Sequence, residues 1–305
     1  MKGIFSPAPL KRMGGSTLVE MDDTLQLKSH AKVNLRLEIL KEREDGYHEL
    51  RTLLQKISLH DTLHVSLKKE KGISIETDHP NLSVGKSNLA YKAARSLLKK
   101  SDFKGGVRIE IKKRIPLGAG LGGGSSNAAT TLKALNQLLK IGLPKKELMG
   151  MGSEIGADIP FFFFGGSAIA SGIGERLKKI ELPDLWYVLI YPNFEVSTRW
   201  AYRNFILTKR RFHFKFHKFL KTPEEISHLL WNDLEGVVSL EHPEIGVMKK
   251  MLLSAGAMGA LMTGSGATVF GIFSEKGNAS KAYKKVKRMV KRKRWAVLKA
   301  RSVNT

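Results

Sequence analysis

The sequence of 305 residues contains no cysteine. This absence excludes disulfide bonds, thiolate metal sites and cysteine nucleophiles, and it agrees with a reducing cytoplasm. No apolar run reaches transmembrane length, because the longest, residues 159–170, is interrupted by Gly165 and Gly166. Residues 1–23 carry proline, glycine and charge without an apolar core segment, which predicts a disordered extension and not a signal peptide. We therefore expect a cytoplasmic protein that does not associate with membranes.

Acidic residues are scarce: 28 Asp and Glu stand against 52 Lys and Arg, which gives a formal net charge of +24. Such a balance attracts anions, whether nucleic acid, phosphorylated metabolites or a membrane surface. Much of the charge lies in residues 203–221 and 281–301, and no acidic residue follows Glu275. In the second run Ala282 and Val286 recur at helical spacing, which indicates an amphipathic helix whose solvated side is basic.

Apolar spacing along the chain predicts strands and helices in mixed order. The expected strands share alternation of apolar and polar residues and cover 31–40, 53–67, 106–111 and 186–191. The expected helices share apolar residues three or four apart and cover 88–99, 128–139, 145–155, most of 223–240, and 245–254. Strand-and-turn segments are expected at 161–177 and 260–273. Because the order has no regular βαβ rhythm, the fold class is α+β, with domains at 24–180 and 181–305.

The stretch PLGAGLGGGSSN, from Pro116, holds five glycines within seven residues between an expected strand and an expected helix. Bare backbone N–H groups can converge on an anion there, and the positive end of the following helix favours phosphate. The stretch is not a Walker A loop, because no lysine follows the glycines. It is not a dinucleotide fingerprint either, because no βαβ unit frames it. The sequence therefore predicts a phosphate-binding loop of another kind.

Three segments, in order, resemble the motifs of the GHMP kinase superfamily. They are AKVNLRLEIL from Ala31 with DGYHEL from Asp45, then the glycine stretch, then GALMTGSGATVFGIF from Gly259. Within that superfamily, DGYH together with GADIPFFFFGG from Gly156 is similar to the family of kinases that act on 4-diphosphocytidyl-2-C-methyl-D-erythritol. The resemblance covers residues 28–273 and is specific in combination, although one glycine motif alone would be weak.

This resemblance implies phosphoryl transfer from ATP to the 2-hydroxyl of that cytidyl substrate, in the non-mevalonate route to isoprenoid precursors. The implied fold joins an N-terminal domain similar to the second domain of ribosomal protein S5 to a ferredoxin-like C-terminal domain, with the active site in the cleft between them. ATP and Mg²⁺ are the implied cofactors, since a metal normally bridges the β and γ phosphate oxygens. No dedicated carboxylate ligand for the metal can be identified.

The resemblance also implies roles for individual residues. Asp158 matches the catalytic base, Lys32 the cation paired with it, and Asn34 a substrate-binding asparagine. A carboxylate within hydrogen-bond reach can deprotonate an alcohol, and a neighbouring cation keeps it ionised. Residues 32, 34 and 36 lie on one face of the expected strand, so an alternative interpretation is that this polar face simply meets solvent.

The remaining implied ligands fall into two groups. Tyr47 and His48 match a cytidine pocket that an aromatic residue closes, which we assign to Tyr202 with Trp200 as the alternative. Asn88 is the implied ligand for adenine or ribose. The implied ligands for the ATP phosphates are the residues of the glycine loop, Gly118, Gly120, Gly122, Gly123, Gly124, Ser125 and Ser126. Gly264, Ser265 and Gly266 are placed to support this loop or to touch substrate phosphate.

Two other functions compete with this interpretation. Another GHMP kinase with a small alcohol substrate, such as homoserine kinase, would have no base to stack on the aromatic residues. A nucleic-acid-binding protein would explain the basic runs but would leave three glycine-rich motifs without a role. We therefore expect small-molecule partners, no nucleic acid, and a monomer or a weak homodimer.

Overall fold

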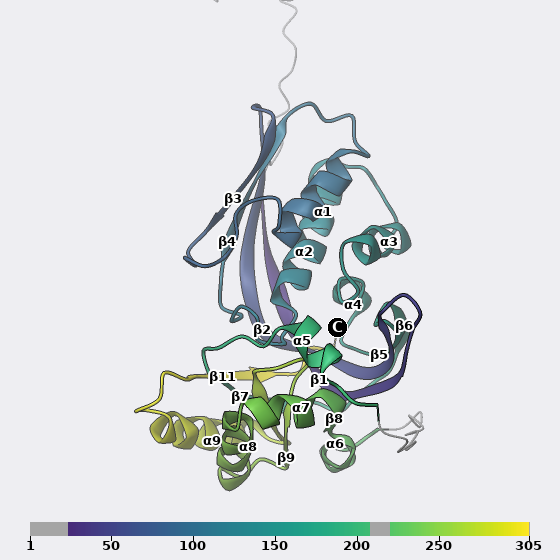
Figure 1. Ribbon diagram of the computed structural model, residues 1–305. Coiled ribbons are helices and arrows are strands. Elements are labelled where there is room, and N and C mark those ends of the chain that lie inside the picture. The colour runs from purple at the N-terminus through teal and green to yellow at the C-terminus, as the bar shows by residue number, and fades with distance from the viewer. Residues whose placement is uncertain (1–23, 208–219, 305) are drawn as a thin grey trace, which may run out of the picture.

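The computed structural model describes residues 24–207 and 220–304. The expected N-terminal extension and most of the first basic run therefore lie outside the described residues. A long antiparallel hairpin of β1 (Thr24–Glu42) and β2 (His48–Lys68) runs through the molecule (Figure 1). Its turn closes where Asp45 and Gly46 were expected to make it, with the Asp45 carboxylate accepting the Tyr47 N–H at 3.1 Å. Gly46 has a φ of 77°, which a glycine adopts without strain.

The hairpin forms the centre of a seven-stranded sheet in the order β3-β4-β2-β1-β8, with β5 paired to β2 and β6 to β5. The added strands are β3 (Gly72–Thr77), β4 (Gly106–Lys112), β5 (Ser167–Gly172), β6 (Arg176–Lys179) and β8 (Trp231–Asn232). Helices cover one face of β2, β3 and β4 in Figure 1, namely α1 (Leu89–Leu98), α2 (Gly123–Leu138) and α3 (Lys145–Ile155). A core of Leu, Ile, Val and Ala side chains lies between the helices and this face.

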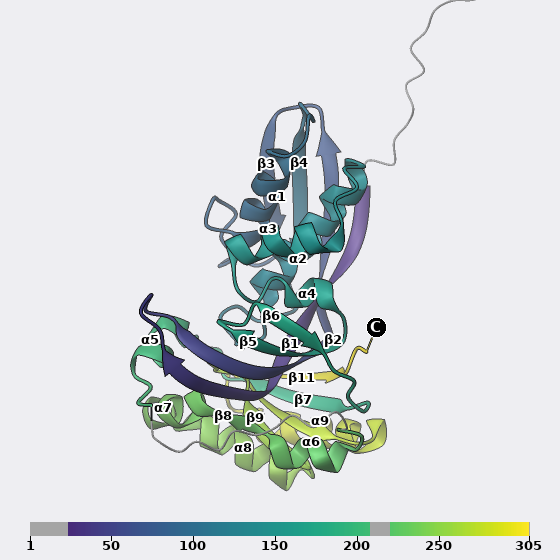
Figure 2. The same cartoon turned by 90° about the vertical axis from the view of Figure 1, so that its right-hand side faces the viewer.

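A second, antiparallel sheet lies below the hairpin in the order β11-β7-β10-β9 (Figure 2). Its strands are β7 (Trp186–Tyr191), β9 (Gly259–Met262), β10 (Val269–Phe273) and β11 (Ala296–Arg301). On its outer side lie α8 (Glu244–Ser254) and α9 (Lys276–Met289), with α7 (Asp233–Glu241) and α6 (Pro223–Leu229) beside them. Its inner side packs Tyr187, Leu189 and Phe270 against Leu35 and Leu53 of the hairpin.

The mixed α+β fold is confirmed, and two local predictions need correction. The stretch 223–240 is mostly helical as expected, with the short strand β8 between α6 and α7 pairing in parallel with Arg36 and Leu37 of β1. Phe161–Phe164 form a single helical turn, α4, where a strand was expected. Residues 31–39 are buried on both faces of β1 and not on one. The second sheet covers the apolar side, and the polar side contacts the glycine loop, Thr52 and Arg51 of β2, and the Leu229 carbonyl. Within the described residues, no helix is long and apolar enough to cross a membrane.

Candidate functional site

The glycine loop lies between β4 and α2 and leads directly into the helix. Gly118, Gly120 and Gly122 have φ values of 56°, 74° and 69°, in the left-handed region that favours glycine. Gly122 precedes the first residue of α2, and its carbonyl accepts the Ser126 N–H at 2.9 Å. The helix therefore presents its positive end at the loop, which suits an anion.

The loop lies against the lysine of the first motif. The backbone N–H of Lys32 donates to the Leu121 carbonyl at 3.0 Å, so the loop continues the hydrogen bonding of β1. A Cβ built on Gly122 would lie 3.0 Å from Cγ of Lys32, which leaves no room for a side chain. The Lys32 ammonium lies 3.4 Å from the Asp158 carboxylate, whose side chain is 42% exposed. This places a cation and an accessible carboxylate directly beside the glycine loop.

Asn34 joins this pair to the rest of the site. Its side-chain oxygen accepts from the Lys32 ammonium at 2.7 Å, and its amide nitrogen donates to Thr52 Oγ1 at 2.8 Å. Its backbone N–H donates to Thr263 Oγ1 at 2.9 Å. Lys32 is 5% and Asn34 3% exposed, so the alternative of a solvent-facing polar face is wrong. Local periodicity could not single out Thr52 or Thr263, because each bonds to Asn34 from another segment of the chain.

The third motif forms the loop between β9 and β10 and contacts the glycine loop through backbone. A Cβ built on Gly264 would lie 3.1 Å from the Gly120 carbonyl oxygen, and one on Gly120 would clash with the Thr263 carbonyl. Asn232, which sequence reasoning missed, donates to the Met262 and Gly264 carbonyls at 2.8 Å each. The Ser265 hydroxyl is 2.9 Å from Thr198 Oγ1, in the first turn of α5 (Thr198–Arg203). The three motifs therefore meet at Lys32 and Asn34.

An aromatic pair lies farther along the hairpin. The rings of His48 and Tyr202 have centroids 5.3 Å apart and are tilted by 42°. Burial raises the pKa of the Tyr202 phenol well above its usual range, and the charges of Asp158 and Asp233 raise it further. The phenol therefore stays protonated at neutral pH. Tyr47, at the hairpin turn, is 60% exposed.

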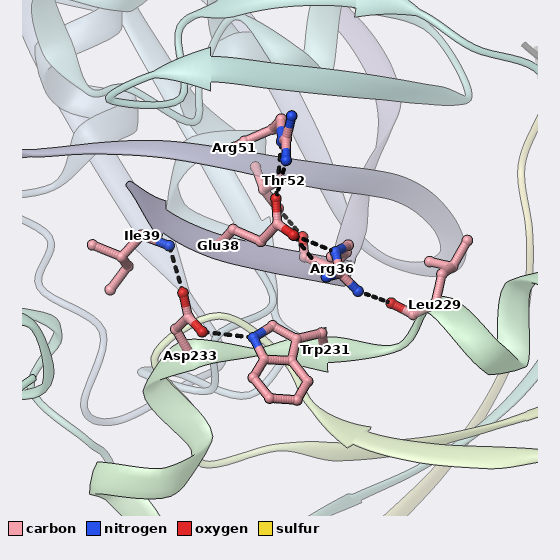
Figure 3. A network of polar contacts seen from close by, with 8 residues as sticks. All are labelled: Arg36, Glu38, Ile39, Arg51, Thr52, Leu229, Trp231 and Asp233. Atoms are coloured by element: carbon pink, nitrogen blue, oxygen red, sulfur yellow. Dashed lines mark hydrogen bonds and ion pairs between the residues drawn. The ribbon is translucent and has the colours of Figure 1, made fainter. Parts of the chain in front are cut away.

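Charged side chains connect β1 to its neighbours between Lys32 and the His48–Tyr202 pair (Figure 3). The buried Glu38 carboxylate accepts from Arg36 Nε at 2.7 Å and from Arg51 Nε at 2.9 Å. Arg36 also donates to the Leu229 carbonyl at 2.8 Å. Beneath β1, Asp233 accepts from the Ile39 N–H and from Trp231 Nε1, each at 2.6 Å (Figure 3). These bonds fix β1 to β2 and β8, and so fix the distance from Lys32 to the hairpin turn.

Two predicted nucleotide ligands already have partners within the protein. The Ser126 hydroxyl is buried and accepts a hydrogen bond from Ser29 Oγ at 2.8 Å. Asn88 caps α1, accepting the Ala90 N–H at 2.8 Å and donating to the Ser83 carbonyl at 2.6 Å. Ser125 is less buried than Ser126. In residues 24–207 and 220–304, no group of three or more His, Asp and Glu side chains could hold a metal ion.

Family models and curated relatives match most of this chain. The domain family described as GHMP kinases N terminal domain matches residues 88–166, and GHMP kinases C terminal matches residues 216–292. A 4-diphosphocytidyl-2-C-methyl-D-erythritol kinase of Geobacter sulfurreducens is 44% identical over 92% of this chain and 99% of its own length. The enzyme of that name from Syntrophus aciditrophicus is 46% identical over 92% of this chain and 100% of its length.

Solved structures give the same result for the fold. A crystal structure of 4-(cytidine 5'-diphospho)-2C-methyl-D-erythritol kinase superposes with a TM-score of 0.73 at 36% identity, covering 91% of this chain and 99% of that one. A homoserine kinase from Cytophaga hutchinsonii reaches a TM-score of 0.70 at 21% identity, covering 95% of this chain and 98% of that one. At that identity the second likeness concerns the fold alone.

Proposed function

Because the chain belongs to the 4-diphosphocytidyl-2-C-methyl-D-erythritol kinase family, we propose that it transfers the γ-phosphoryl group of ATP to the 2-hydroxyl of 4-diphosphocytidyl-2-C-methyl-D-erythritol. Membership of this family makes the chain a kinase of the non-mevalonate isoprenoid pathway. The identity of the acceptor oxygen and the roles of individual residues are our proposal. The observation that carries it is the Lys32–Asp158 pair beside the glycine loop.

Asp158 is the general base in this proposal. Its partly exposed carboxylate accepts the proton of the attacking hydroxyl as the new O–P bond forms and the ADP oxygen leaves. Lys32 holds the carboxylate in place and offers positive charge where negative charge develops on the transferring group. Asn34 fixes the Lys32 ammonium through a 2.7 Å hydrogen bond, so the pair needs little reorganisation during the reaction.

The glycine loop and the start of α2 fit the polyphosphate of ATP. Left-handed glycines and a helix N-terminus offer backbone N–H groups without side-chain obstruction. Ser125 adds a hydroxyl group there. The Ser126 hydroxyl already accepts a hydrogen bond from Ser29, so Ser126 would contribute by holding the loop in position. Mg²⁺ is bound in many kinases chiefly by phosphate oxygens, water and one or two carboxylates. The Ser125 hydroxyl and the phosphate oxygens of ATP fit such a site, at which the metal would offset phosphate charge.

The aromatic pair is the cytosine site in this proposal. The Tyr202 ring and the His48 ring form a surface on which a flat base can stack, and the imidazole can hydrogen-bond an edge of the base. Tyr47 closes the pocket from the exposed hairpin turn. A small acceptor such as homoserine would leave this surface unused.

The test is ADP release from purified protein with ATP, Mg²⁺ and the cytidyl substrate, with homoserine and mevalonate offered in parallel. Asp158→Asn keeps the size of the side chain and removes its basicity, so we expect kcat to fall about 10²- to 10⁴-fold. Asp184→Asn is the matched control, because the Asp184 carboxylate accepts hydrogen bonds from Ser302 Oγ at 3.3 Å and from Asn304 Nδ2 at 2.7 Å, both of which follow β11. Turnover with homoserine or mevalonate in place of the cytidyl substrate would contradict the proposal.

A further inference from the structure

A second polar cluster lies beneath the glycine loop, on its buried side. Asp61 of β2 is completely buried, and the side chain of Lys113, just after β4, is only 2% exposed. These two side chains form an ion pair. Neither belongs to the motifs that suggested the kinase, and neither contacts the Lys32–Asp158 pair in the described structure.

Asp61 accepts four donors from two separate segments. Its Oδ1 accepts the backbone N–H groups of Arg114 and Ile115 at 2.8 and 2.9 Å. Its Oδ2 accepts from the Lys113 ammonium and from Asn127 Nδ2, the latter at 3.0 Å. One carboxylate therefore holds the three residues before Pro116 and Asn127, the fifth residue of α2.

Ser29 of β1 strengthens the second attachment. Asn127 Nδ2 also donates to Ser29 Oγ at 2.9 Å, and Ser29 Oγ donates to Ser126 Oγ at 2.8 Å. Ser126 and Asn127 follow the last glycine of the loop with only Ser125 between. Both ends of the glycine loop are thus fixed to one buried cluster.

The buried ion pair is expensive if stability is its only purpose. Removing two charges from water costs several kcal/mol per ion, and well-packed apolar residues often serve stability equally well. What apolar residues cannot do is fix the orientation of two backbone segments through directional bonds. The cluster lies close to the phosphate site, since a Cβ built on Gly123 would lie 3.2 Å from the Lys113 ammonium.

We propose that Asp61 is a positioning residue for the nucleotide: it holds both ends of the glycine loop so that the loop's N–H groups are arranged for phosphate before ATP binds. Preorganisation of this kind lowers the free-energy cost of binding. The inference rests on the proposed function only in taking the loop as the ATP site. It predicts that loss of the carboxylate weakens nucleotide binding selectively and leaves acceptor binding unchanged.

The primary test is Asp61→Asn. The amide oxygen can still accept the Arg114 and Ile115 N–H groups, but the NH₂ group would face the Lys113 and Asn127 donors. We expect the KM for ATP and the Kd for MgADP, measured by calorimetry without acceptor, to rise about tenfold, which corresponds to about 1.4 kcal/mol. The KM for the cytidyl substrate should stay within about twofold of wild type.

Asn136→Ala is the matched control at the opposite end of α2. Asn136 bonds the Leu143 N–H at 2.9 Å and the Leu143 carbonyl at 3.0 Å, far from the loop. This variant should lower the melting temperature without changing the Kd for MgADP. If Asp61→Asn fails to fold, Ser29→Ala provides the test. It leaves the Asp61–Lys113 ion pair intact and removes the hydrogen bonds to Ser126 and Asn127. We expect it to raise the Kd for MgADP about two- to fivefold.

An unchanged Kd for MgADP in the folded variant would overturn the proposal, and so would an equal rise in both KM values. Wild-type protein that binds MgADP but phosphorylates a different acceptor would contradict the proposed function and leave this inference standing. Wild-type protein that binds no MgADP would overturn both.

Discussion

The two ends of the candidate site are built differently. At the catalytic end Lys32 and Asn34 are 5% and 3% exposed and are held by the glycine loop, β2 and the third motif. At the base end Tyr47 is 60% exposed, and the described contact is a tilted ring pair of His48 and Tyr202 at 5.3 Å. Directional hydrogen bonds dominate the first end, and aromatic surface dominates the second.

This difference matches the roles that we propose for the two ends, namely phosphoryl transfer at the first and binding of the base at the second. Proton and phosphoryl transfer tolerate little displacement, so the groups involved need several fixed bonds. Stacking on a base depends on overlap of flat surfaces and tolerates small shifts. We therefore expect changes at the catalytic end to lower kcat and changes at the base end to raise KM.

Lys32→Met should have the largest effect on activity. Methionine keeps the apolar stem but removes the charge beside Asp158, so we expect kcat to fall about 10²- to 10³-fold. The KM for the cytidyl substrate should change little, as steady-state kinetics would measure. An increase in KM at constant kcat would mean that Lys32 binds substrate and takes no part in the reaction.

Tyr202→Ala should have the next largest effect, and it should change KM rather than kcat. Loss of a stacked ring costs about 1–3 kcal/mol per base, so the KM for the cytidyl substrate should rise about tenfold or more with kcat within a few-fold. Tyr202→Phe keeps the ring and should stay within about threefold. Tyr47→Ala should raise KM less than Tyr202→Ala, because Tyr47 is more exposed. The reverse order would place the base on the hairpin turn.

Lys56→Met should have the smallest effect on activity and should raise stability. Lys56 is the cross-strand neighbour of Lys32, and burial, with the charges of Lys133 and Lys145, lowers its pKa to about 8. Below pH 8 Lys56 is charged in both the folded and the unfolded protein, so the folded state bears the full free-energy cost of burying that charge. This cost fades as pH rises from about 8 to the unfolded value of about 10.5. Chemical denaturation at pH 7 should therefore give Lys56→Met about 1–3 kcal/mol of extra stability, shrinking towards pH 10.

Lys284→Met, on the exposed face of α9, is the control for this measurement and should change the free energy of unfolding by less than about 0.5 kcal/mol. A gain for Lys56→Met that does not depend on pH would show that apolar packing, and not the buried charge, is responsible.

Local patterns in the sequence predicted much of the fold. The hairpin, β4 with the glycine loop and α2, helix α3 and strand β7 all follow from periodicity and turn residues over a short span. The pattern failed where structure depends on distant partners. Strand β8 has two residues and exists because β1 offers an edge, which no local period can reveal.

The same limit applies to the site. Residues within contiguous motifs, such as Lys32, Asn34 and the glycines, could be singled out from the sequence, although their roles remain proposals. Thr52 and Asp61 lie outside the motifs and Thr263 lies inside the third, but local pattern identified none of them, because their importance comes from hydrogen bonds to other segments of the chain. The burial of the polar face of β1 was also beyond the sequence, since a polar residue at every second position, here Lys32, Asn34, Arg36 and Glu38, is typical of an exposed strand face.

The close approach of Gly120 and Gly264 limits how this kinase can adapt to new substrates. The two loops meet through bare backbone, and a side chain at either glycine would push one loop from the other. Substitution there would move Lys32 and Asn34 as well, since both loops are bonded to them. In the arrangement that we propose, new acceptor preferences would therefore arise at the hairpin turn and α5, where side chains can be exchanged without disturbing Lys32 and Asn34. The molecule thus separates the positions that evolution can vary from those that it has to keep.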